Sequence, residues 1–246
     1  MPRFFVSQSA VTETRATVTG GELEHMRRVF RLRPGDRVTL FDDTGREHEG
    51  VIRSYGAAAA EVEILNSERP ARESKLRIIL AQALGKGEKM DLVVEKATEL
   101  GVQTIVPFLS SHAVPKLDAR KSAKRRERWQ KIALSAAKQS GRTRIPEILE
   151  LTDFASLISK SWPCEQKLLF GPGEAGETLR QVREDVAQLG SVLLVIGPEG
   201  GWAPEEIAAA AQRGFRTARL GRRILRTETA ALAAVSIAQF IWGDIE

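Results

Sequence analysis

The pattern of apolar and polar positions divides the chain into two regions. From Lys75 onward, short apolar runs alternate with longer segments whose apolar residues recur every three or four positions. The runs expected to be strands are Leu76–Ala81, Thr104–Phe108, Lys167–Phe170, Val192–Ile196 and Phe215–Leu220. The segments expected to be helices are Lys89–Leu100, Lys121–Gln139, Glu177–Leu189, Pro204–Arg213 and Thr227–Trp242. Apolar strands that alternate with helices predict an α/β domain with a parallel sheet covered on both faces.

The first 65 residues have a β-rich pattern instead. Arg37–Phe41 and Gly50–Arg53 are predicted strands on either side of a turn at residues 42–45. Ala60–Leu65 alternates apolar and polar residues with a period of two, as a half-buried strand does. Short strands joined by glycine-containing turns predict a small β-barrel.

A polar segment without periodicity separates the two regions. Asn66–Ser74 contains Pro70 and is expected to be the linker. A length of 246 residues fits one large or two modest domains. We therefore expect a β-barrel domain over residues 1–70 and an α/β domain over residues 71–246.

The composition excludes several classes of protein. Hydrophobic residues make up 42% and charged residues 28%, which excludes a disordered chain and collagen. The single cysteine, Cys164, cannot pair within the chain, so a disulfide scaffold is excluded and a reducing compartment is expected. No secretory signal is visible, and the most apolar stretch, Ala230–Trp242, is too short to span a bilayer. We expect a cytoplasmic protein that does not bind a membrane.

The positive charge of the chain is concentrated in one segment. The formal net charge is +5, but residues 116–144 hold eleven basic and two acidic residues, and the remainder is mildly acidic. Within the segment, an apolar stripe of helical spacing lies beneath the basic face; it consists of Trp129, Ile132, Ala133, Ala136 and Ala137. This pattern favours a polyanionic partner over a merely solvated helix face, because few acids are available for pairing along the helix. A non-catalytic RNA-binding assembly protein would fit this feature.

Three glycine-rich loops follow predicted strands of the α/β domain: Gly171–Gly176, Gly197–Gly201 and Leu220–Ala230. In open parallel sheets, ligands bind outside the carboxyl ends of the strands. The first loop matches the dinucleotide fingerprint G-x-G-x-x-G, so an NAD-dependent oxidoreductase is an alternative function. Pro172 has no N–H to offer a pyrophosphate, so a plain turn is favoured.

The other two loops each allow two interpretations. The sequence Gly-Pro-Glu-Gly-Gly at Gly197–Gly201 either brings the main chain close to a ligand or makes a tight strand-to-helix connection. In the third loop, Thr227 is expected to cap the last helix. Arg226 and Glu228 either pair on the surface or handle proton transfer and anion binding. The three histidines and Cys164 are too scattered for a zinc site, so no metal is expected.

Four motifs in order along the chain resemble those of one family. They are Pro2–Phe5 with His25 and residues 28–31, the sequence EKATELG at 95–101, the sequence SGRTRIP at 140–146, and GPEGG at 197–201 with LG at 220–221 and LRTETA at 225–230. Together they resemble, nearly from end to end, the bacterial small-subunit ribosomal RNA uracil-N3-methyltransferase family of the SPOUT class.

The resemblance implies a fold and a function that the pattern alone does not. The fold would be a PUA-like β-barrel followed by a SPOUT α/β domain with a C-terminal trefoil knot, a rare exception to unknotted topology. The cofactor would be S-adenosylmethionine, and the protein would be a homodimer. The target would be a uridine in the decoding region of 16S ribosomal RNA, either as naked RNA or in the small ribosomal subunit.

The resemblance also assigns roles to residues. Those expected around the cofactor are Leu169, Phe170, Gly171, Ile196, Gly197, Pro198, Glu199, Gly200, Leu220, Gly221, Ile224, Leu225, Thr229 and Ala230. Those expected to contact RNA are Arg3, Arg28 and Arg31 in the barrel and Ser140 and Arg144 near the uridine. The charge pattern, and not the resemblance, adds Arg125, Arg126 and Arg128 of the basic segment to the expected RNA contacts. Ala203 stands where a capping Ser or Thr is expected in the family, so the helix after it is expected to start less favourably.

Catalysis requires two further roles. Uracil N3 carries a proton that must leave before or during methyl transfer, and the uracil oxygens gain negative charge as it leaves. Arg226 or Arg142 would stabilise that charge. Glu228 or Glu99 would accept the proton, although either carboxylate equally suits the orientation of an arginine.

Overall fold

A computed structural model describes residues 1–85, 89–110, 119–171 and 176–246, which form two compact units. The first, which we call the β unit, consists of residues 1–73 and 134–145. The second, the α/β unit, consists of residues 74–133 and 146–246. Each unit has a hydrophobic core of its own.

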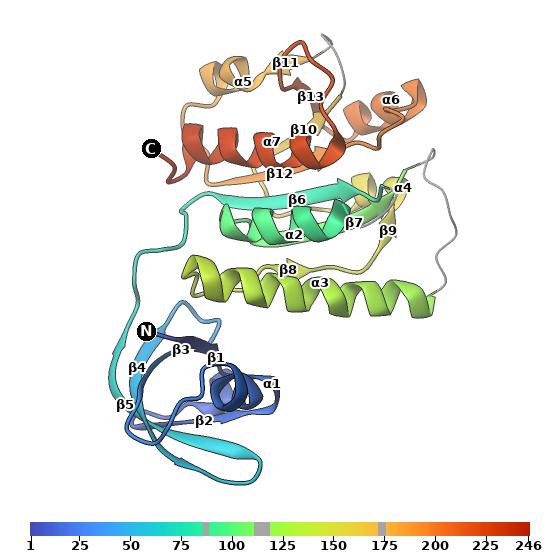
Figure 1. The fold of residues 1–246 in the computed structure, drawn as a ribbon. Helices are drawn as coiled ribbons and strands as arrows, with labels where there is room; N and C mark the ends of the chain where they lie inside the picture. Colours follow the sequence, from blue (N-terminus) through green and yellow to red (C-terminus); the bar gives the residue numbers. More distant parts are fainter. Residues whose placement is uncertain (86–88, 111–118, 172–175) are drawn as a thin grey trace. The chain divides into compact units, whose positions relative to one another are not determined.

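The β unit is a curled five-stranded sheet with the order β1-β3-β4-β5-β2 (Figure 1). Its strands are β1 (Arg3–Phe5), β2 (Arg15–Thr19), β3 (Arg37–Phe41), β4 (Glu47–Tyr55) and β5 (Ala59–Glu68). β1 pairs with β3 in parallel, and the other neighbours are antiparallel. Apolar side chains from alternate positions, such as Phe4, Leu40 and Val62, form its core. The predicted barrel is confirmed as a curled half-barrel.

Short helical segments connect the strands of the β unit. They are η1 (Gln8–Ala10), α1 (Gly20–Glu24) and η2 (His25–Val29), of which η2 is a π-helical turn. Gly50 lies at a bulge in β4, where a Cβ atom would come within 2.5 Å of Val62 Cγ1. The predicted linker Asn66–Ser74 is wrong at its start, because residues 66–68 extend β5 and pair with β4.

The α/β unit contains a parallel sheet in the order β11-β13-β10-β12-β6-β7-β8, with β9 paired to β7, which confirms the predicted fold class. The strands are β6 (Arg77–Ala83), β7 (Thr104–Leu109), β8 (Glu147–Ile148), β9 (Thr152–Asp153), β10 (Gln166–Phe170), β11 (Glu177–Thr178), β12 (Ser191–Ile196) and β13 (Arg216–Arg219). β12 and β6 lie near the middle of the sheet and are the most completely buried of its longer strands, as expected for strands covered on both faces.

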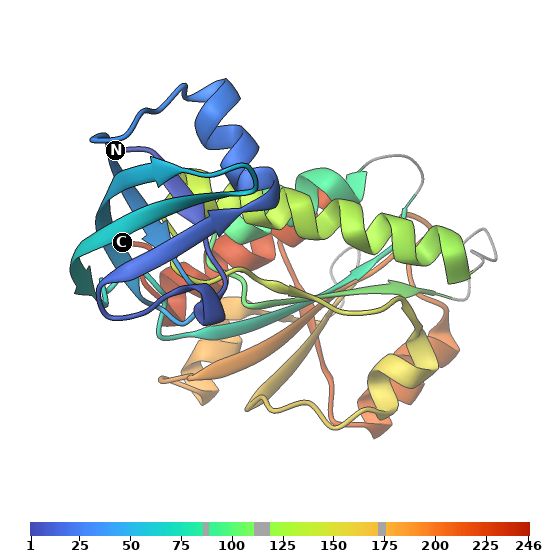
Figure 2. The ribbon, with the colours of Figure 1, turned by 90° about the horizontal axis from the view of Figure 1, so that it is seen from below.

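Helices cover both faces of this sheet (Figure 2). They are α2 (Lys89–Glu99), α3 (Ala119–Ser140), α4 (Phe154–Ser159), α5 (Leu179–Asp185), α6 (Pro204–Gln212) and α7 (Thr227–Trp242). On one face, α2 packs against α7, and α7 contacts β6 and β12. On the other face, α4 packs against α6 and shares a core cluster with the strands. Among the described helices, none combines the length and apolar character needed to cross a membrane.

Two helix ends show how local sequence determines the boundaries. α2 ends just before Gly101, which adopts a φ of +82°, and the N–H of Val102 bonds back to the carbonyl of Ala97, as at a glycine-capped helix end. The predicted helix over residues 177–189 is wrong at both ends. At its start, Thr178 caps α5 by accepting a hydrogen bond from the Gln181 N–H, and Glu177 belongs to β11. At its other end, the helix stops at Asp185.

Candidate functional site

A cavity of about 740 Å³ lies in the α/β unit at the carboxyl ends of the sheet strands. Its walls come from the ends of β10 and β12, the loops that follow β12 and β13, and the first turn of α7. Twelve predicted cofactor residues line it: Phe170, Gly171, Ile196, Gly197, Pro198, Glu199, Gly200, Leu220, Gly221, Ile224, Leu225 and Ala230. The structure therefore brings together the loops that follow β12 and β13 with Gly171, the first residue of the remaining glycine-rich loop, as the strand-end rule predicts.

Two of the predicted cofactor residues do not line the cavity. Leu169 belongs to the core cluster on one face of the sheet, because successive residues of β10 point to opposite faces. Thr229 is exposed, whereas Thr227 and Ala230 line the cavity. Residues three apart share a face of a helix, which explains why Thr227 and Ala230 line it together.

Trp202 joins two of the loops and was not predicted. Its indole N–H donates to the carbonyl of Phe170 over 2.8 Å, and its ring stacks on Phe108. A Cβ atom at Gly197 would lie 2.8 Å from this indole, so a glycine is required there. Trp202 follows the GPEGG sequence directly, and this position was the only signal in the sequence that could have identified it.

A buried polar relay runs beneath the cavity from the centre of the sheet. Gln82 in β6 donates from Nε2 to Thr227 Oγ1 over 2.7 Å. The Thr227 hydroxyl in turn donates to the carbonyl of Gly197 over 2.9 Å. The prediction that Thr227 caps α7 is therefore wrong: Arg226 occupies the cap position, and the threonine hydroxyl serves the glycine loop instead. Gln82 was missed because it looks like one polar interruption in an apolar strand.

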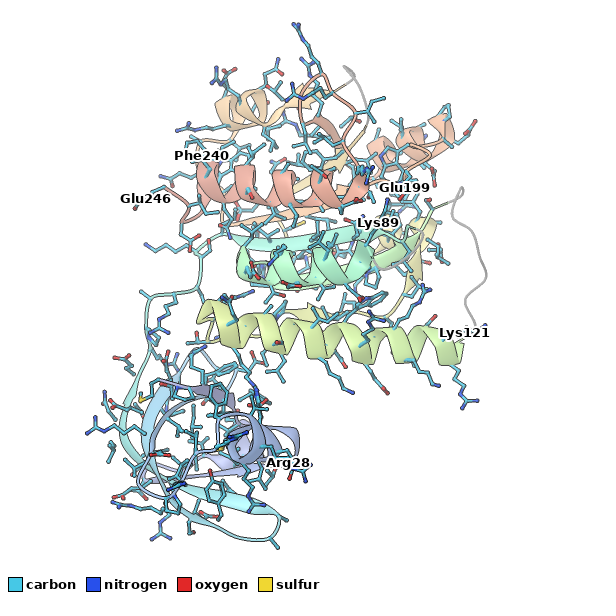
Figure 3. All side chains as sticks on the ribbon, in the orientation of Figure 1. Arg28, Lys89, Lys121, Glu199, Phe240 and Glu246 are labelled. Carbon is cyan, nitrogen blue, oxygen red and sulfur yellow. The ribbon has the colours of Figure 1, made fainter. Side chains whose placement is uncertain are left out.

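Two charged residues that line the cavity, Lys89 and Glu199, form a cluster with Glu228, which is not among the lining residues. Lys89, the first residue of α2, hydrogen-bonds to Glu199 and has its Nζ 3.6 Å from Glu228 Oε2 (Figure 3). The hydrogen bond to Glu199 raises the pKa of Lys89, so the ammonium stays protonated. Among the residues that the structure describes, the ion-pair partner of Glu228 is thus Lys89, and no ion pair joins Glu228 to Arg226. Glu228 Oε2 is shielded from solvent and accepts no hydrogen bond from those residues, while Arg226 lines the cavity.

The SGRTRIP motif at residues 140–146 is held by acids of the β unit. Arg142 is 4% exposed, and its Nε and Nη2 both donate to Glu73 Oε2, at 3.1 and 2.8 Å. The other oxygen of Glu73 accepts from the N–H groups of Thr143 and Arg144. The Arg144 side chain donates to the carbonyls of residues 43 and 44. The Ile145 N–H donates to Asp43 Oδ1 over 2.6 Å, so two carboxylates, Glu73 and Asp43, hold the motif in its folded shape.

Other predicted RNA contacts differ in their surroundings. Arg3 is largely buried, pairs with Glu47 and donates to the carbonyl of Arg142 within the β unit. The Ser140 hydroxyl donates back to the carbonyl of Ala136, one helical turn earlier. These two side chains are occupied by structural contacts. By contrast, Arg28 and Arg31 are exposed on the β unit.

The basic helix α3 is not a uniform row of unpaired cations. Arg126 donates from Nε to the carbonyl of Ile148 over 2.8 Å. Arg128 pairs with Asp91, which also accepts the Trp129 indole N–H. Arg125 is exposed and has no ion-pair partner among residues 1–85, 89–110, 119–171 and 176–246. Acids from other elements pair with two of its three predicted RNA-binding arginines, since Glu150 Oε1 lies 3.5 Å from Arg126 Nη1 and Asp91 pairs with Arg128. Few acids lie within the helix segment itself, but counting them does not identify these partners.

The first glycine-rich loop is described only at its ends. Residues 172–175 lie outside the described residues, so the dinucleotide fingerprint is not tested there. Gly171 lines the cavity. Gly176 has a φ of +96°, and a Cβ atom there would lie 2.8 Å from the carbonyl oxygen of Thr217. The groups of histidine, cysteine and acidic residues within the described chain include none suited to hold a metal ion.

Known proteins share both units. Residues 72–239 match the RNA methyltransferase domain family, and residues 18–65 match the RNA methyltransferase PUA domain family. Ribosomal RNA small subunit methyltransferase E of Bacillus subtilis is 31% identical over 243 residues, which cover 96% of this chain and 95% of that protein. The protein of the same name from Mycobacterium tuberculosis is 34% identical over 237 residues, 94% of this chain and 88% of its own.

Solved structures agree in fold over the full length. Ribosomal RNA small subunit methyltransferase E from Neisseria gonorrhoeae, bound to S-adenosyl methionine, superposes with a TM-score of 0.89 at 34% identity and 100% coverage of both chains. A Legionella pneumophila methyltransferase in complex with the same cofactor has a TM-score of 0.89 at 33% identity, covering 99% of this chain and 98% of that one.

Proposed function

Because this chain belongs to the ribosomal RNA small subunit methyltransferase E family, we propose that it transfers a methyl group from S-adenosylmethionine to N3 of a uridine in 16S ribosomal RNA. The observation that carries the proposal is the cavity at the strand ends, whose walls include the glycine-rich loops after β12 and β13 and Gly171 after β10. A ribosomal RNA substrate implies that the reaction takes place in the cytoplasm.

The cavity fits S-adenosylmethionine in size and in chemistry. Its volume of about 740 Å³ lies within the range of small-molecule sites. Phe170, Ile196 and Leu220 supply apolar walls for an adenine ring, and the glycines expose backbone N–H and C=O groups for its polar edge. Glu199 lines the cavity together with the basic residues Lys89, Arg223 and Arg226, so both the ammonium and the carboxylate group of the cofactor would find an opposite charge there. When bound, the cofactor supplies an electrophilic methyl carbon on a positively charged sulfur.

The chain must then handle a proton and a developing negative charge. The N3–H proton of uracil passes to a carboxylate, the N3 lone pair forms the new bond to the methyl carbon, and the electron pair of the broken carbon–sulfur bond stays on sulfur. Glu228 is the proposed proton acceptor, because its Oε2 is shielded and accepts no hydrogen bond from the described residues. Glu228 adjoins the cavity through its contact with Lys89, whereas Arg226 lines the cavity itself and would stabilise the negative charge on the uracil oxygens.

The arginines outside the cavity divide into two proposed roles. Arg28, Arg31 and Arg125 are exposed and would bind RNA phosphates. Arg3 and Arg142 are buried in ion pairs, and we assign them the positioning of the SGRTRIP motif instead of a direct contact with the uridine.

A homodimer is the proposed assembly, and an exposed apolar face on α7 supports it. Phe240 near the end of the helix is 66% exposed (Figure 3), and Ile237 is exposed one turn before it. Leu92, on the adjacent helix α2, is also exposed. Exposed apolar side chains on a helix surface are typical of a surface that another chain covers. The trefoil knot stays a prediction from the family resemblance.

The other functions considered have less support. The oxidoreductase depends on the Gly171–Gly176 fingerprint, most of which lies outside the described residues. A non-catalytic RNA-binding assembly protein would leave the cavity and its charged edge without a role. Calorimetry on the full-length protein separates these classes: we expect binding of S-adenosylmethionine and none of NAD. Binding of NAD alone would overturn the proposal.

Methyl transfer is tested on small ribosomal subunits from cells that lack this protein. We expect incorporation of one methyl group per subunit, mapped by mass spectrometry to N3 of a single uridine. Arg226→Ala should reduce turnover about 100-fold, the usual effect of losing a donor that stabilises a transition-state oxyanion. Arg226→Lys should restore part of the rate, since it restores the charge. Near-normal turnover of Arg226→Ala at saturating RNA would contradict the catalytic role of this arginine.

A further inference from the structure

Residues 27–33 of the β unit, which we call the Phe30 tip, combine exposed apolar and cationic side chains. Val29 is 65% exposed and Phe30 is 44% exposed, although both belong to residue types that are usually buried. They stand between Arg28 and Arg31, which are also exposed (Figure 3). An exposed aromatic ring between two arginines is the combination that single-stranded nucleic acids bind.

The backbone of the tip is held in an unusual shape. Residues 25–29 form a π-helical turn, and π-turns are frequently found at functional sites. The N–H of Phe30 bonds to the carbonyl of His25, and the N–H of Leu32 bonds to that of Met26. Arg31 has a φ of +53°, a conformation that a side chain with a Cβ disfavours. Such strain persists where the surroundings fix it, and it presents Phe30 and Arg31 at the end of the turn.

The Phe30 ring is fixed by neighbouring rings and still accessible. It packs edge to face against Phe4, with centroids 5.6 Å apart and planes at 82°. His25 contacts it from 5.1 Å. Phe4 is fully buried, so Phe30 rests on the core of the β unit without being covered itself. A ring that is already ordered loses little entropy when a flat ligand stacks on it.

The charges around the ring favour RNA over a protein partner. Residues 24–33 contain four arginines and one acid, Glu24. Arg27 is anchored, because it donates to the carbonyls of residues 56 and 57 and lies over the Tyr55 ring. Arg28 is 81% exposed at its side chain and pairs with Glu24 across one helical turn, a surface pair that a phosphate can replace at little cost.

We propose that Phe30 is a stacking platform for an unpaired base of the RNA substrate, with Arg28 and Arg31 binding the phosphates on either side of that base. The inference rests on the proposed function in taking RNA as the ligand. Stacking requires an exposed base face, so the ligand is a single-stranded or looped segment and not a continuous duplex.

The test measures binding of a labelled single-stranded 12-nucleotide RNA and of a fully paired RNA hairpin to the full-length protein. Phe30→Leu keeps apolar packing against Phe4 but removes the flat ring, and we expect it to weaken single-strand binding about tenfold. Phe30→Trp should bind as well as the wild type or better. Val29→Ala is the matched control beside it, and its affinity should be unchanged. Hairpin binding should differ little among all four proteins.

Salt dependence separates stacking from charge. Phe30→Leu should leave the slope of log K against log salt unchanged, whereas Arg28→Gln and Arg31→Gln should each reduce it by about 0.7. Thermal melting of each variant shows that the β unit stays folded. If Phe30→Leu bound the single-stranded RNA with the affinity of the wild type, the inference would be overturned. The Phe30 tip would then be interpreted as a binding surface for an apolar protein partner. If Phe30→Leu weakened binding of the paired hairpin as much as binding of the single strand, the stacking inference would also be overturned.

Methyl transfer by the wild-type protein distinguishes the two proposals. If the wild type methylates small subunits while Phe30→Leu binds RNA normally, only the stacking inference fails. If Phe30→Leu loses single-strand binding while the wild type transfers no methyl group to ribosomal RNA, the proposed function fails and the stacking site stands.

Discussion

The side-chain amide of Gln82 donates a 2.7 Å hydrogen bond to the hydroxyl of Thr227, which lies 145 residues further along the chain. Gln82 lies in β6, near the middle of the parallel sheet, and Thr227 is the first residue of α7, the last helix. The same hydroxyl donates to the carbonyl of Gly197, in the loop that forms the floor of the cavity. The position of that glycine loop is therefore determined by a polar contact in the core and not only by its own sequence.

Substitutions in this relay should affect both stability and cofactor binding. Thr227→Val removes the acceptor of one Gln82 N–H, and we expect it to lower the free energy of unfolding by about 1–3 kcal/mol. It also releases the Gly197 carbonyl, which should raise the Kd for S-adenosylmethionine about tenfold. Thr227→Ser keeps the hydroxyl and is the control, expected to bind normally. Denaturant titration and calorimetry measure the two effects.

The double variant tests whether the relay acts as a unit. Gln82→Leu combined with Thr227→Val should cost less than the sum of the single changes, because each single change disrupts the same contact. Strictly additive effects, or normal cofactor binding by Thr227→Val, would contradict the role assigned to the relay.

Local patterns predicted much of the α/β unit. Apolar runs and helical spacing identified β6, β7, β10, β12 and α7 to within about two residues, since buried strands and amphipathic helices repeat with fixed periods. The glycine loops could be placed together because parallel strands deliver their carboxyl ends to one edge. Short elements such as β8, β9 and α4 were missed, because two to six residues do not establish a period.

Contacts between distant segments could not be predicted. Glu73 falls in the predicted linker, and nothing nearby indicates that it pairs with Arg142 69 residues away. The partners of the basic helix also come from other elements. Arg128 pairs with Asp91 of α2, and Arg126 donates to the carbonyl of Ile148 in β8. Counting acids within one helical turn therefore overestimated the free positive charge.

The ion pair between Arg142 and Glu73 should be structural. Glu73→Gln weakens the support of a nearly buried guanidinium, and breaking such a pair is expected to lower the free energy of unfolding by about 3 kcal/mol. Arg142→Lys keeps the charge but loses the two-atom contact, so it should destabilise as well. Arg144→Lys is the control, since Arg144 is exposed and bonds only to backbone carbonyls through its side chain.

Turnover decides between a structural and a catalytic Arg142. At a temperature where the variant is folded, Arg142→Lys should retain a kcat within about twofold of the wild type. A fall of 100-fold in kcat with unchanged stability would instead place Arg142 at the uridine, as the family resemblance first suggested.

The exposed face of α7 should determine the oligomeric state. Phe240→Glu puts a charge on the exposed apolar face of α7, and we expect it to convert a dimer into a monomer, halving the mass in sedimentation velocity. Val29→Glu changes an equally exposed apolar residue of the β unit and should leave the dimer intact. A wild type that sediments as a monomer at micromolar concentration would contradict the proposed assembly.

The three arginines of the basic helix should contribute unequally to RNA binding. Arg125 is exposed without an ion-pair partner among the described residues, so Arg125→Gln should reduce the slope of log K against log salt by about 0.7 for a single-stranded RNA. Arg126 is committed to the carbonyl of Ile148, so Arg126→Gln should leave the slope nearly unchanged and lower the melting temperature instead. Cofactor affinity should be the same in both variants, because neither residue lines the cavity. Equal slopes for the wild type and Arg125→Gln would mean that this helix face is solvated and does not follow the RNA backbone.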